Sequence, residues 1–325
     1  MCTARAPSNG VSALSVLITG GCGYVGTKLT EAVLERTSLP ITVLDTMWFG
    51  NHLPIHPRLT FLAMDVRRID EIDLSSYDTV FHLANIANDP SVELNPYSSW
   101  EVNVLAGMRL VDRAARHGVK QFVFASSASV YGLKSEPRVT EELELFPLSE
   151  YNKTKMVAER VVLSYSDSMV VTVIRPATVC GYSPRMRLDL TVNLLTMQAL
   201  TRGAVTVLGG AQTRPNVHVD DLVDAYLFAY DRRLAGVYNV GFENLSVLDI
   251  AKAVTREVPA SIDIKLSNDP RSYSVCSDKF LATGFAPKRN VQTAVREIAE
   301  AYRDGRLKDE PISYNVQWMQ QHNFA

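Results

Sequence analysis

Short apolar runs alternate with helical patterns through the first half of the chain. The runs have strand length, and the segments between them repeat apolar residues at the three- and four-residue spacing of an amphipathic helix. Strands that alternate with helices predict a parallel sheet covered on both faces, and right-handed crossovers favour a doubly wound α/β sheet. The predicted strands are 16–18, 41–44, 59–64, 79–83, 121–125 and 170–174, and the predicted helices are 23–36, 97–117 and 151–165.

The regular alternation of strand-like and helical segments ends after Pro176, where strand-like runs become rarer and Arg, Pro and Gly become more frequent. A helix at 217–230 and a strand at 236–240 interrupt this part, and the strand could return to the main sheet. We therefore expect two interdependent lobes and a short extension. The flexible leader is 1–14, the first lobe is 15–178 with 216–242, and the smaller, less regular second lobe is 179–215 with 243–325.

The composition of the 325 residues excludes several classes of function. Lys and Arg number 33 against 35 Asp and Glu, and this near-neutral balance argues against non-specific binding to nucleic acid or to an anionic membrane. No apolar run is long enough to span a membrane. The four cysteines are scattered, without metal-ligand spacing, which predicts no metal site and fits a reducing, cytoplasmic setting.

The strongest local motif is a glycine-rich turn between the first strand and the first helix. Gly20, Gly23 and Gly26 form a G-x-x-G-x-x-G pattern there, with Tyr24 and Val25 opening the helix. Glycines permit a tight turn and let main-chain N–H groups approach a pyrophosphate, whose charge the helix N-terminus favours. The turn predicts a dinucleotide site.

Acidic residues at the ends of later strands extend this prediction. Asp45 ends the second strand, where a carboxylate can accept hydrogen bonds from adenosine ribose hydroxyls and would repel a 2′-phosphate. The cofactor is therefore predicted to be NAD rather than NADP. Asp65 and Val66 follow the third strand, near the expected adenine, and Leu83 and Ala84 follow the fourth.

A serine, a tyrosine and a lysine supply candidate acid–base chemistry. Tyr151 and Lys155 are four residues apart and share one helix face. A nearby ammonium favours the phenolate, so Lys155 is expected to lower the pKa of Tyr151 toward the range of a general base. Ser127, in the Ser-rich run that follows the fifth strand, could hold a substrate hydroxyl against Tyr151.

Taken together, these motifs resemble the extended short-chain dehydrogenase/reductase family of nucleotide-sugar epimerases and dehydratases. The resemblance spans about residues 15–310 and implies NAD on a Rossmann lobe, a nucleotide-sugar under the C-terminal lobe, and a homodimer formed by helices 97–117 and 151–165. It also implies that Ser127 and Tyr151 act on a sugar hydroxyl, while Lys155 binds the nicotinamide ribose and tunes Tyr151.

The same resemblance implies contacts with the substrate diphosphate. Asn193, Arg214 and Arg271 match the family's asparagine and its two arginines, and a guanidinium fork suits phosphate. Thr178 stands where many relatives have Asn. Arg185 and Arg187 lie near the predicted sugar pocket, where they would recognise a modified hexose, a heptose or an acidic group; a surface loop is the alternative.

One departure from the family pattern narrows the chemistry. The resembling 4,6-dehydratases carry an Asp–Glu pair where this chain has Ala128 and Ser129. An NAD-dependent 4-epimerase acting through a 4-keto intermediate is therefore predicted. A nucleotide-sugar 4-dehydrogenase or 4-ketoreductase, acting for example on an NDP-heptose, and a non-catalytic NAD-binding sensor remain alternatives.

Overall fold

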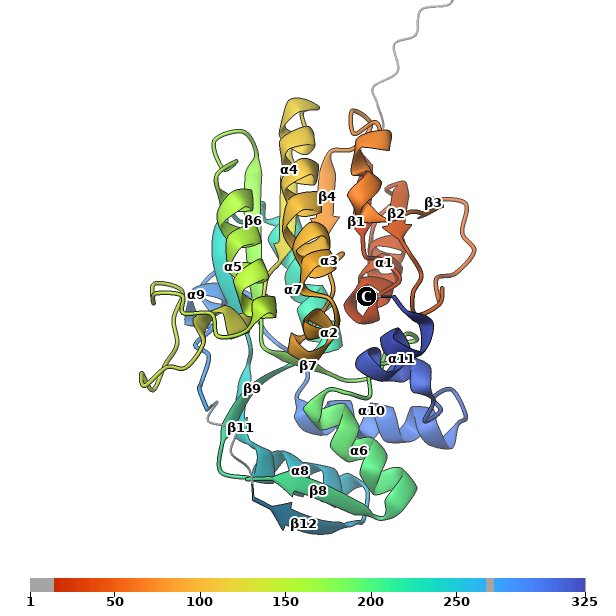
Figure 1. Cartoon of the computed structure of the whole chain (residues 1–325), viewed down its shortest axis with the longest axis vertical. Helices are drawn as coiled ribbons and strands as arrows, with labels where there is room; N and C mark the ends of the chain where they lie inside the picture. Colours follow the sequence, from red (N-terminus) through yellow and green to blue (C-terminus); the bar gives the residue numbers. More distant parts are fainter. Residues whose placement is uncertain (1–14, 267–271, 325) are drawn as a thin grey trace, which may run out of the picture.

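A computed structural model describes residues 15–266 and 272–324, so the predicted leader 1–14 lies outside the described residues (Figure 1). Its centre is a seven-stranded sheet in which every neighbouring pair is parallel. The strands are β1 (Val16–Thr19), β2 (Ile41–Asp45), β3 (Leu59–Ala63), β4 (Thr79–His82), β5 (Gln121–Ala125), β6 (Val170–Pro176) and β10 (Gly236–Val240).

The strand order confirms the predicted doubly wound sheet. The order is β10-β6-β5-β4-β1-β2-β3, so the chain runs outward from β1 in one direction and then returns to build outward from β4 in the other. The strand at 236–240 does join this sheet, beside β6. In such folds the crevice between the two directions, at the carboxyl ends of the strands, is where ligands bind.

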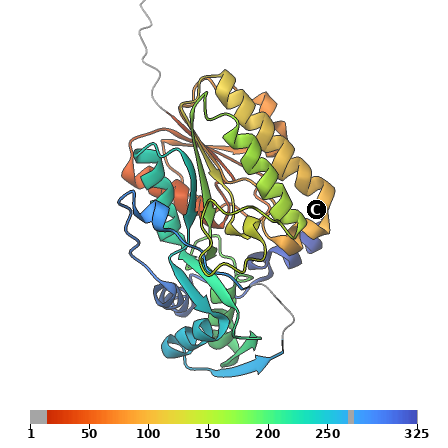
Figure 2. The ribbon, with the colours of Figure 1, turned by 90° about the vertical axis from the view of Figure 1, so that its left-hand side faces the viewer.

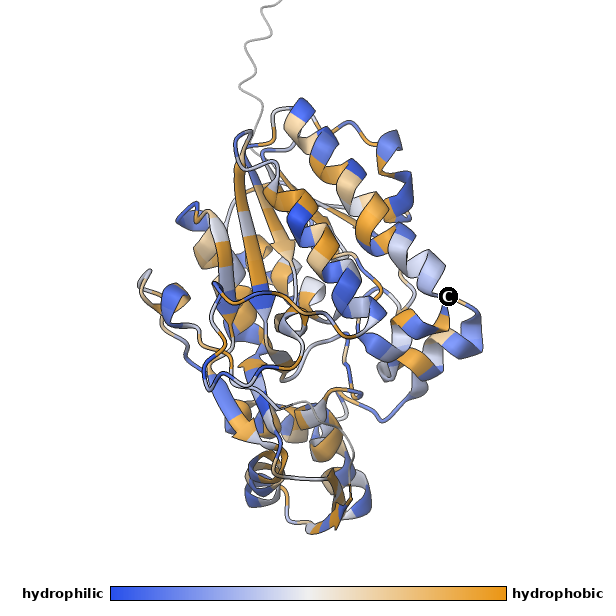
Figure 3. Cartoon of the chain, turned by 60° about the vertical axis from the view of Figure 1, so that its left-hand side comes forward, coloured by the Kyte–Doolittle hydropathy of each residue, from blue (hydrophilic) through white to orange (hydrophobic). Residues whose placement is uncertain are grey.

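Helices cover both faces of the sheet, which Figure 2 shows edge-on between two helical layers. Val16 and Ile18 of β1 pack toward α1 (Tyr24–Arg36) and α7 (Val219–Asp231). Leu17 packs toward α4 (Gly107–Arg116) and α5 (Glu150–Leu163) on the opposite side. The middle strands of the sheet are mostly hydrophobic in Figure 3, as expected where both faces are buried.

The helix predicted at 97–117 is interrupted by a wide turn. It consists of α3 (Pro96–Trp100), a π-helical turn η2 (Glu101–Ala106), and α4. Asn103 in this turn accepts a hydrogen bond from the Ile86 main-chain nitrogen at 2.7 Å and donates one to the Ile86 oxygen at 3.1 Å. The side chain of Asn103 in the π-helical turn thus fixes the loop after β4 through the main chain of Ile86.

The second lobe is more regular than the sequence predicted. A three-stranded sheet has the order β11-β9-β7, and β8 pairs with β12 in parallel. These strands were missed because they are short and half exposed; β12, for example, alternates apolar and polar residues. The elements are β7 (Thr178–Cys180), α6 (Thr191–Arg202), β8 (Ala204–Leu208), β9 (Thr213–His218), β11 (Glu243–Ser246), α8 (Val247–Glu257), β12 (Ser261–Lys265) and α10 (Val291–Arg303).

Two segments expected in the second lobe pack on the first. Phe280 of α9 (Asp278–Leu281) joins the core beside β10, and Met319 of α11 (Asn315–His322) joins the core on the α4 side. Trp318 Nε1 donates to the Trp48 oxygen at 2.7 Å, which ties α11 to the loop after β2. The C-terminal segment therefore links the two lobes. Within the described ranges, no helix has the length and apolarity of a membrane span.

Candidate active site

A cavity of about 500 Å³ opens at the carboxyl ends of the central strands and is lined by both lobes. Most of the sequence-predicted site residues meet there, whereas Asn193 is not on its wall and Arg271 lies outside the described residues. The predicted residues on the wall are Gly20, Gly23, Tyr24, Val25, Gly26, Asp45, Asp65, Val66, Leu83, Ala84, Ser127, Tyr151, Lys155, Thr178, Arg185, Arg187 and Arg214.

The glycine-rich turn leaves no room for side chains. A Cβ atom on Gly20, whose φ is +76°, would come within 2.5 Å of the Ala84 nitrogen. A Cβ atom on Gly26 would come within 2.0 Å of the Gly20 oxygen. The N-cap Gly23 offers no capping side chain to the start of α1, so this end of the cavity fits a pyrophosphate bound by main-chain N–H groups.

Asp45 is held against the turn by main-chain donors. Its Oδ2 accepts from the Cys22 nitrogen at 2.9 Å, and its Oδ1 accepts from the Met47 nitrogen at 2.8 Å. Burial raises the pKa of Asp45, and these N–H groups oppose the rise. The carboxylate is thus oriented at the cavity wall as the predicted ribose acceptor requires.

Asp65 serves its own turn as well as the cavity wall. It caps the 3₁₀ turn η1 (Val66–Glu71) by accepting from the Arg67 nitrogen at 2.8 Å, and it also pairs with the Arg67 side chain. Burial alone would raise its pKa, but Arg67 holds the pKa below its usual range. The adenine contact predicted for Asp65 stays a prediction.

Ser127, Tyr151 and Lys155 come together on the cavity wall. Ser149 caps α5 by accepting from the Asn152 nitrogen at 3.2 Å, which places Tyr151 in the first turn and Lys155 one turn later. The Ser127 and Ser129 hydroxyls are 2.8 Å apart, and Ser127 lies close enough to Tyr151 to favour its phenolate. Hydroxyl groups suited to proton transfer therefore gather at this point of the wall.

The electrostatics of Tyr151 differ from the expectation. Burial raises its pKa to about 12, and Ser127 and then Arg187 oppose the rise. Burial lowers the pKa of Lys155 to about 7, and its Nζ donates to the Ala125 oxygen at 2.7 Å. Although the pKa of Tyr151 is raised overall, the cation that opposes this rise is Arg187, rather than Lys155 as the sequence suggested.

A buried network fixes the strand end behind these hydroxyls. Ser126 Oγ donates to Glu159 Oε2 at 2.8 Å, and Arg175 Nε donates to the same oxygen at 3.0 Å. Arg175 Nη1 donates to the Tyr131 hydroxyl at 2.6 Å, which itself donates to Asn239 Oδ1 at 2.8 Å. The network joins β6, α5 and β10 to the Ser-rich run.

Thr178 at the start of β7, Arg187, and Arg214 on β9 also line the wall. Arg187 pairs with Asp189 through Nε at 3.0 Å and Nη2 at 2.9 Å, and Asp189 also accepts from Asn88 Nδ2 at 3.2 Å. This bidentate pair orients the Arg187 guanidinium near Tyr151. The roles of Thr178 and Arg214 toward a substrate remain predictions.

The side chain of Asn193 is used inside the protein. Its Oδ1 accepts from the Gly181 nitrogen at 3.1 Å, and its Nδ2 donates to the Arg187 oxygen at 2.9 Å and to the Tyr24 hydroxyl at 3.2 Å. Tyr24 in turn donates to the Gly181 oxygen at 2.6 Å. In the structure Asn193 therefore braces the start of α1 against the second lobe, away from the cavity.

Sequence reasoning missed several wall residues. Trp48 and Phe49 lie in the loop after the strand of Asp45, and this aromatic pair was the available signal. Asn315 and Met319 carried no signal, because only the fold brings α11 back to the first lobe. Asn85 and Asn152 each keep a buried side-chain oxygen without a protein partner among the described residues, which indicates that this wall is built for a polar ligand.

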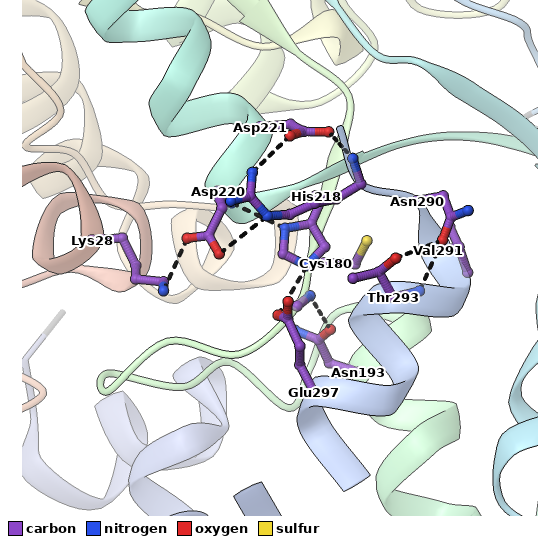
Figure 4. Close-up of polar contacts among 12 residues, drawn as sticks. Lys28, Cys180, Asn193, His218, Asp220, Asp221, Asn290, Val291, Thr293 and Glu297 are labelled. Atoms are coloured by element: carbon purple, nitrogen blue, oxygen red, sulfur yellow. Dashed lines mark hydrogen bonds and ion pairs between the residues drawn. The ribbon is translucent and has the colours of Figure 1, made fainter. Parts of the chain in front are cut away.

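A second polar cluster lies between the lobes, outside the cavity wall (Figure 4). His218, Asp220 and Glu297 present ligand atoms within 4.8 Å of one another. However, His218 Nδ1 accepts from the Asp220 nitrogen, so Nε2 carries the proton and donates to Glu297 at 3.0 Å. Lys28 neutralises Asp220 at 2.9 Å. These partners make the cluster a junction between α1, α7 and α10.

The chain is similar to NAD-dependent enzymes of nucleotide-sugar metabolism. Residues 16–241, more than half of the chain, match the NAD-dependent epimerase/dehydratase family. The UDP-glucose 4-epimerase of Lactobacillus helveticus is 27% identical over 311 residues, which cover 85% of this chain and 92% of that protein.

Solved structures with this fold include two different chemistries. The Thermus thermophilus UDP-glucose 4-epimerase in complex with NAD has a TM-score of 0.77 and 25% identity, covering 89% of this chain and 99% of that one. TunA, an NAD-dependent NDP-hexosamine 5,6-dehydratase, has a TM-score of 0.79 and 27% identity, covering 90% and 98%. Overall likeness therefore leaves the reaction to be argued from the site.

Proposed function

The chain belongs to the NAD-dependent epimerase/dehydratase family of enzymes, and from this premise we propose that it is a nucleotide-sugar 4-epimerase. One observation carries the proposal. The positions beside Ser127 hold a buried alanine, Ala128, and a serine, Ser129, so this run supplies hydroxyls for proton transfer and no acid–base pair for eliminating water.

The hydroxyl groups of Ser127 and Tyr151 on the cavity wall support a reversible oxidation at one sugar carbon. Ser127 orients the substrate 4-hydroxyl, and Tyr151 removes its proton. Lys155 would hold the nicotinamide ribose, and Arg187 is the cation that favours the Tyr151 phenolate. Bound NAD would supply the reversible hydride acceptor, so that the hydride of carbon 4 leaves and returns to the opposite face of that carbon after the 4-keto sugar has rotated in the cavity. Tyr151 then returns the proton to the oxygen, and the carbon has the opposite configuration.

The second lobe supports an anionic, nucleotide-linked substrate. Arg214 on β9 lines the cavity, and a guanidinium is suited to a diphosphate. Arg187, oriented near Tyr151, is suited to the sugar. UDP-sugars are the first substrates to test, because the relatives named above include UDP-glucose 4-epimerases.

The deciding experiment follows the cofactor as well as the sugar. The purified protein is incubated with UDP-, dTDP- and GDP-hexoses without added cofactor, and sugar inversion is followed by NMR. We expect catalytic turnover with no net change in absorbance at the NADH wavelength. Turnover that occurs only after NAD or NADH is added, with stoichiometric conversion of that cofactor, would instead identify a 4-dehydrogenase or 4-ketoreductase.

We also propose that the enzyme is a cytoplasmic homodimer. Leu105 and Met108 on the outer side of η2 and α4 are 44% and 41% exposed, and their three-residue spacing puts them on one helix face beside α5. Exposed apolar side chains grouped on one face support an interface with a second copy. The cytoplasmic setting rests on the thiols of Cys22, Cys180 and Cys276, which are buried and unpaired.

A further inference from the structure

Arg185 is buried in the cavity wall, yet it has no counter-ion there. It is 3% exposed, and among the described residues no carboxylate lies within ion-pair distance of it. Arg187, two residues later, is neutralised by Asp189. An isolated buried charge is energetically unfavourable, so a buried guanidinium without a carboxylate partner indicates a binding site for an anionic ligand.

The guanidinium fork of Arg185 is also only partly used. Nη1 donates to the Met186 oxygen at 3.0 Å, and Nη2 donates to Asn315 Oδ1 at 2.6 Å. Nε is buried without a partner in the described structure. Since the fork carries five N–H donors, several remain for a ligand.

The neighbours of Arg185 belong to the cofactor end of the cavity. Its guanidinium carbon lies 4.1 Å from the centre of the Phe49 ring, in the loop after β2. Asn315, its hydrogen-bond partner, is the first residue of α11, which returns from the second lobe to the side of α2 (Asp89–Leu94) in Figure 1. Phe49 lies four residues after Asp45, and Trp318 in the helix of Asn315 donates to the Trp48 oxygen, so both neighbours belong to elements joined to the loop after β2.

The loop that carries Arg185 is fastened to the start of α1. Ser183 Oγ donates to the Tyr24 oxygen at 2.8 Å, and the Tyr24 hydroxyl donates to the Gly181 oxygen at 2.6 Å. The electrostatic neighbours of Arg185 match this placement. Burial, and then Arg187, lower the pKa of Arg185 to about 9, while Asp189, Asp45 and Tyr24 oppose the fall.

We propose that Arg185 binds the pyrophosphate of the NAD cofactor from the second lobe, on the side opposite the glycine-rich turn. The first lobe supplies main-chain N–H groups to this anion, and Arg185 supplies the positive charge that the turn lacks. The cofactor is thereby clamped between the lobes, with Phe49 and Asn315 holding the guanidinium in place. Such a clamp retains NAD between the two hydride transfers of one catalytic cycle.

The test compares fragments of the cofactor by calorimetry. R185M keeps the aliphatic stem and removes the fork, and R306M removes an exposed arginine of the second lobe as a matched control. We expect R185M to weaken binding of NADH and of ADP-ribose by about 10-fold to 100-fold, because a charge-assisted hydrogen bond is lost. Binding of adenosine, which lacks the pyrophosphate, should stay within about twofold.

Three results would overturn the proposal. Equal losses for adenosine and ADP-ribose would mean that Arg185 only supports the loop after β2. UDP is titrated as the fragment of the substrate: a loss confined to UDP would place Arg185 on the substrate diphosphate, and unchanged affinities would leave it without a ligand role. R185Q, which keeps an amide donor toward Asn315, is measured in parallel in case R185M fails to fold. These readouts need no turnover, so they do not depend on the proposed reaction.

Discussion

Lys155 donates a hydrogen bond of 2.7 Å from Nζ to the main-chain oxygen of Ala125, the last residue of β5. This contact directs the ammonium toward the strand end. Burial of the side chain, which is 2% exposed, lowers its pKa to about 7. The lysine therefore joins the helix of Tyr151 to the strand that precedes Ser127, and burial makes its positive charge costly to keep.

Replacing Tyr151 by Phe separates chemistry from cofactor binding. Y151F keeps the ring on the cavity wall and removes the hydroxyl whose ionised form Ser127 favours. We expect kcat to fall by about 10²-fold to 10⁴-fold, the usual contribution of a general acid–base group, with the NAD affinity retained. Y165F, at a half-buried tyrosine outside the cavity wall that donates to Asp112, should keep wild-type activity. Full activity in Y151F would remove Tyr151 from the mechanism.

The depressed pKa of Lys155 predicts a pH dependence of stability. Between its folded value of about 7 and its unfolded value near 10.5, the unfolded chain binds a proton that the folded chain does not, so stability rises with pH. It is fully present above the unfolded value and is lost as the pH falls toward 7. Relative to K155M, the wild-type free energy of unfolding should rise by up to about 1.4 kcal/mol per pH unit.

This difference is measured by urea unfolding of the cofactor-free proteins from pH 7 to pH 9. K153M removes an exposed lysine of the same helix, paired with Glu150, and corrects for the loss of one positive charge. If the difference in unfolding free energy between wild type and K155M stayed constant or fell as the pH rises, burial would not disfavour the charged form of Lys155, and the prediction would be wrong.

The first lobe was predictable because its strands are buried on both faces. The run at 16–18 reads as continuous apolar sequence, and its counterpart β1 is fully buried. β12 alternates apolar and polar residues and is mostly exposed, so it gave no comparable signal. Helix α11 lies on the first lobe for reasons of tertiary packing that no local pattern records.

The site was predictable where a sequence motif carries the chemistry. The spacing of Tyr151 and Lys155 places both residues on one helix face, as the structure shows. Spacing does not reveal the direction of the Lys155 ammonium, and its hydrogen bond to the Ala125 oxygen could not be predicted. Likewise, Arg185 and Arg187 are neighbours in sequence, yet one packs on Phe49 and the other pairs with Asp189.

Replacing Gly26 by Ala should distort the glycine-rich turn and weaken its binding of the cofactor pyrophosphate. Its Cβ would lie 2.0 Å from the Gly20 oxygen, so the main chain of the turn must shift. We expect G26A to weaken NAD binding by about 10-fold to 100-fold. G203A, at a φ of +63° with nothing within 4 Å of the new Cβ, should lower stability by about 1 kcal/mol and leave NAD binding unchanged. Equal NAD affinities in both variants would contradict the pyrophosphate assignment.

Charges on the exposed face of η2 and α4 should dissociate the proposed dimer. L105E and M108E each bury a carboxylate in the interface if it exists, and size-exclusion chromatography with light scattering should show monomers. L266E alters an apolar residue of the second lobe that is 99% exposed, and it should leave the dimer intact. A wild-type chain that elutes as a monomer at micromolar concentration would refute the interface.

A double-mutant cycle on the buried pair of Arg175 and Glu159 should separate its contribution to stability from its contribution to catalysis. Both side chains are less than 5% exposed, and Glu159 also accepts from Ser126 at the strand end. R175M leaves the Glu159 carboxylate uncompensated and should cost about 3–5 kcal/mol of unfolding free energy, whereas E159M with R175M should recover much of that loss. Denaturant unfolding measures each corner of the cycle. Because Ser126 precedes Ser127, the double variant should regain stability while its kcat stays below wild type. Recovery of both quantities would show that the pair only fills space.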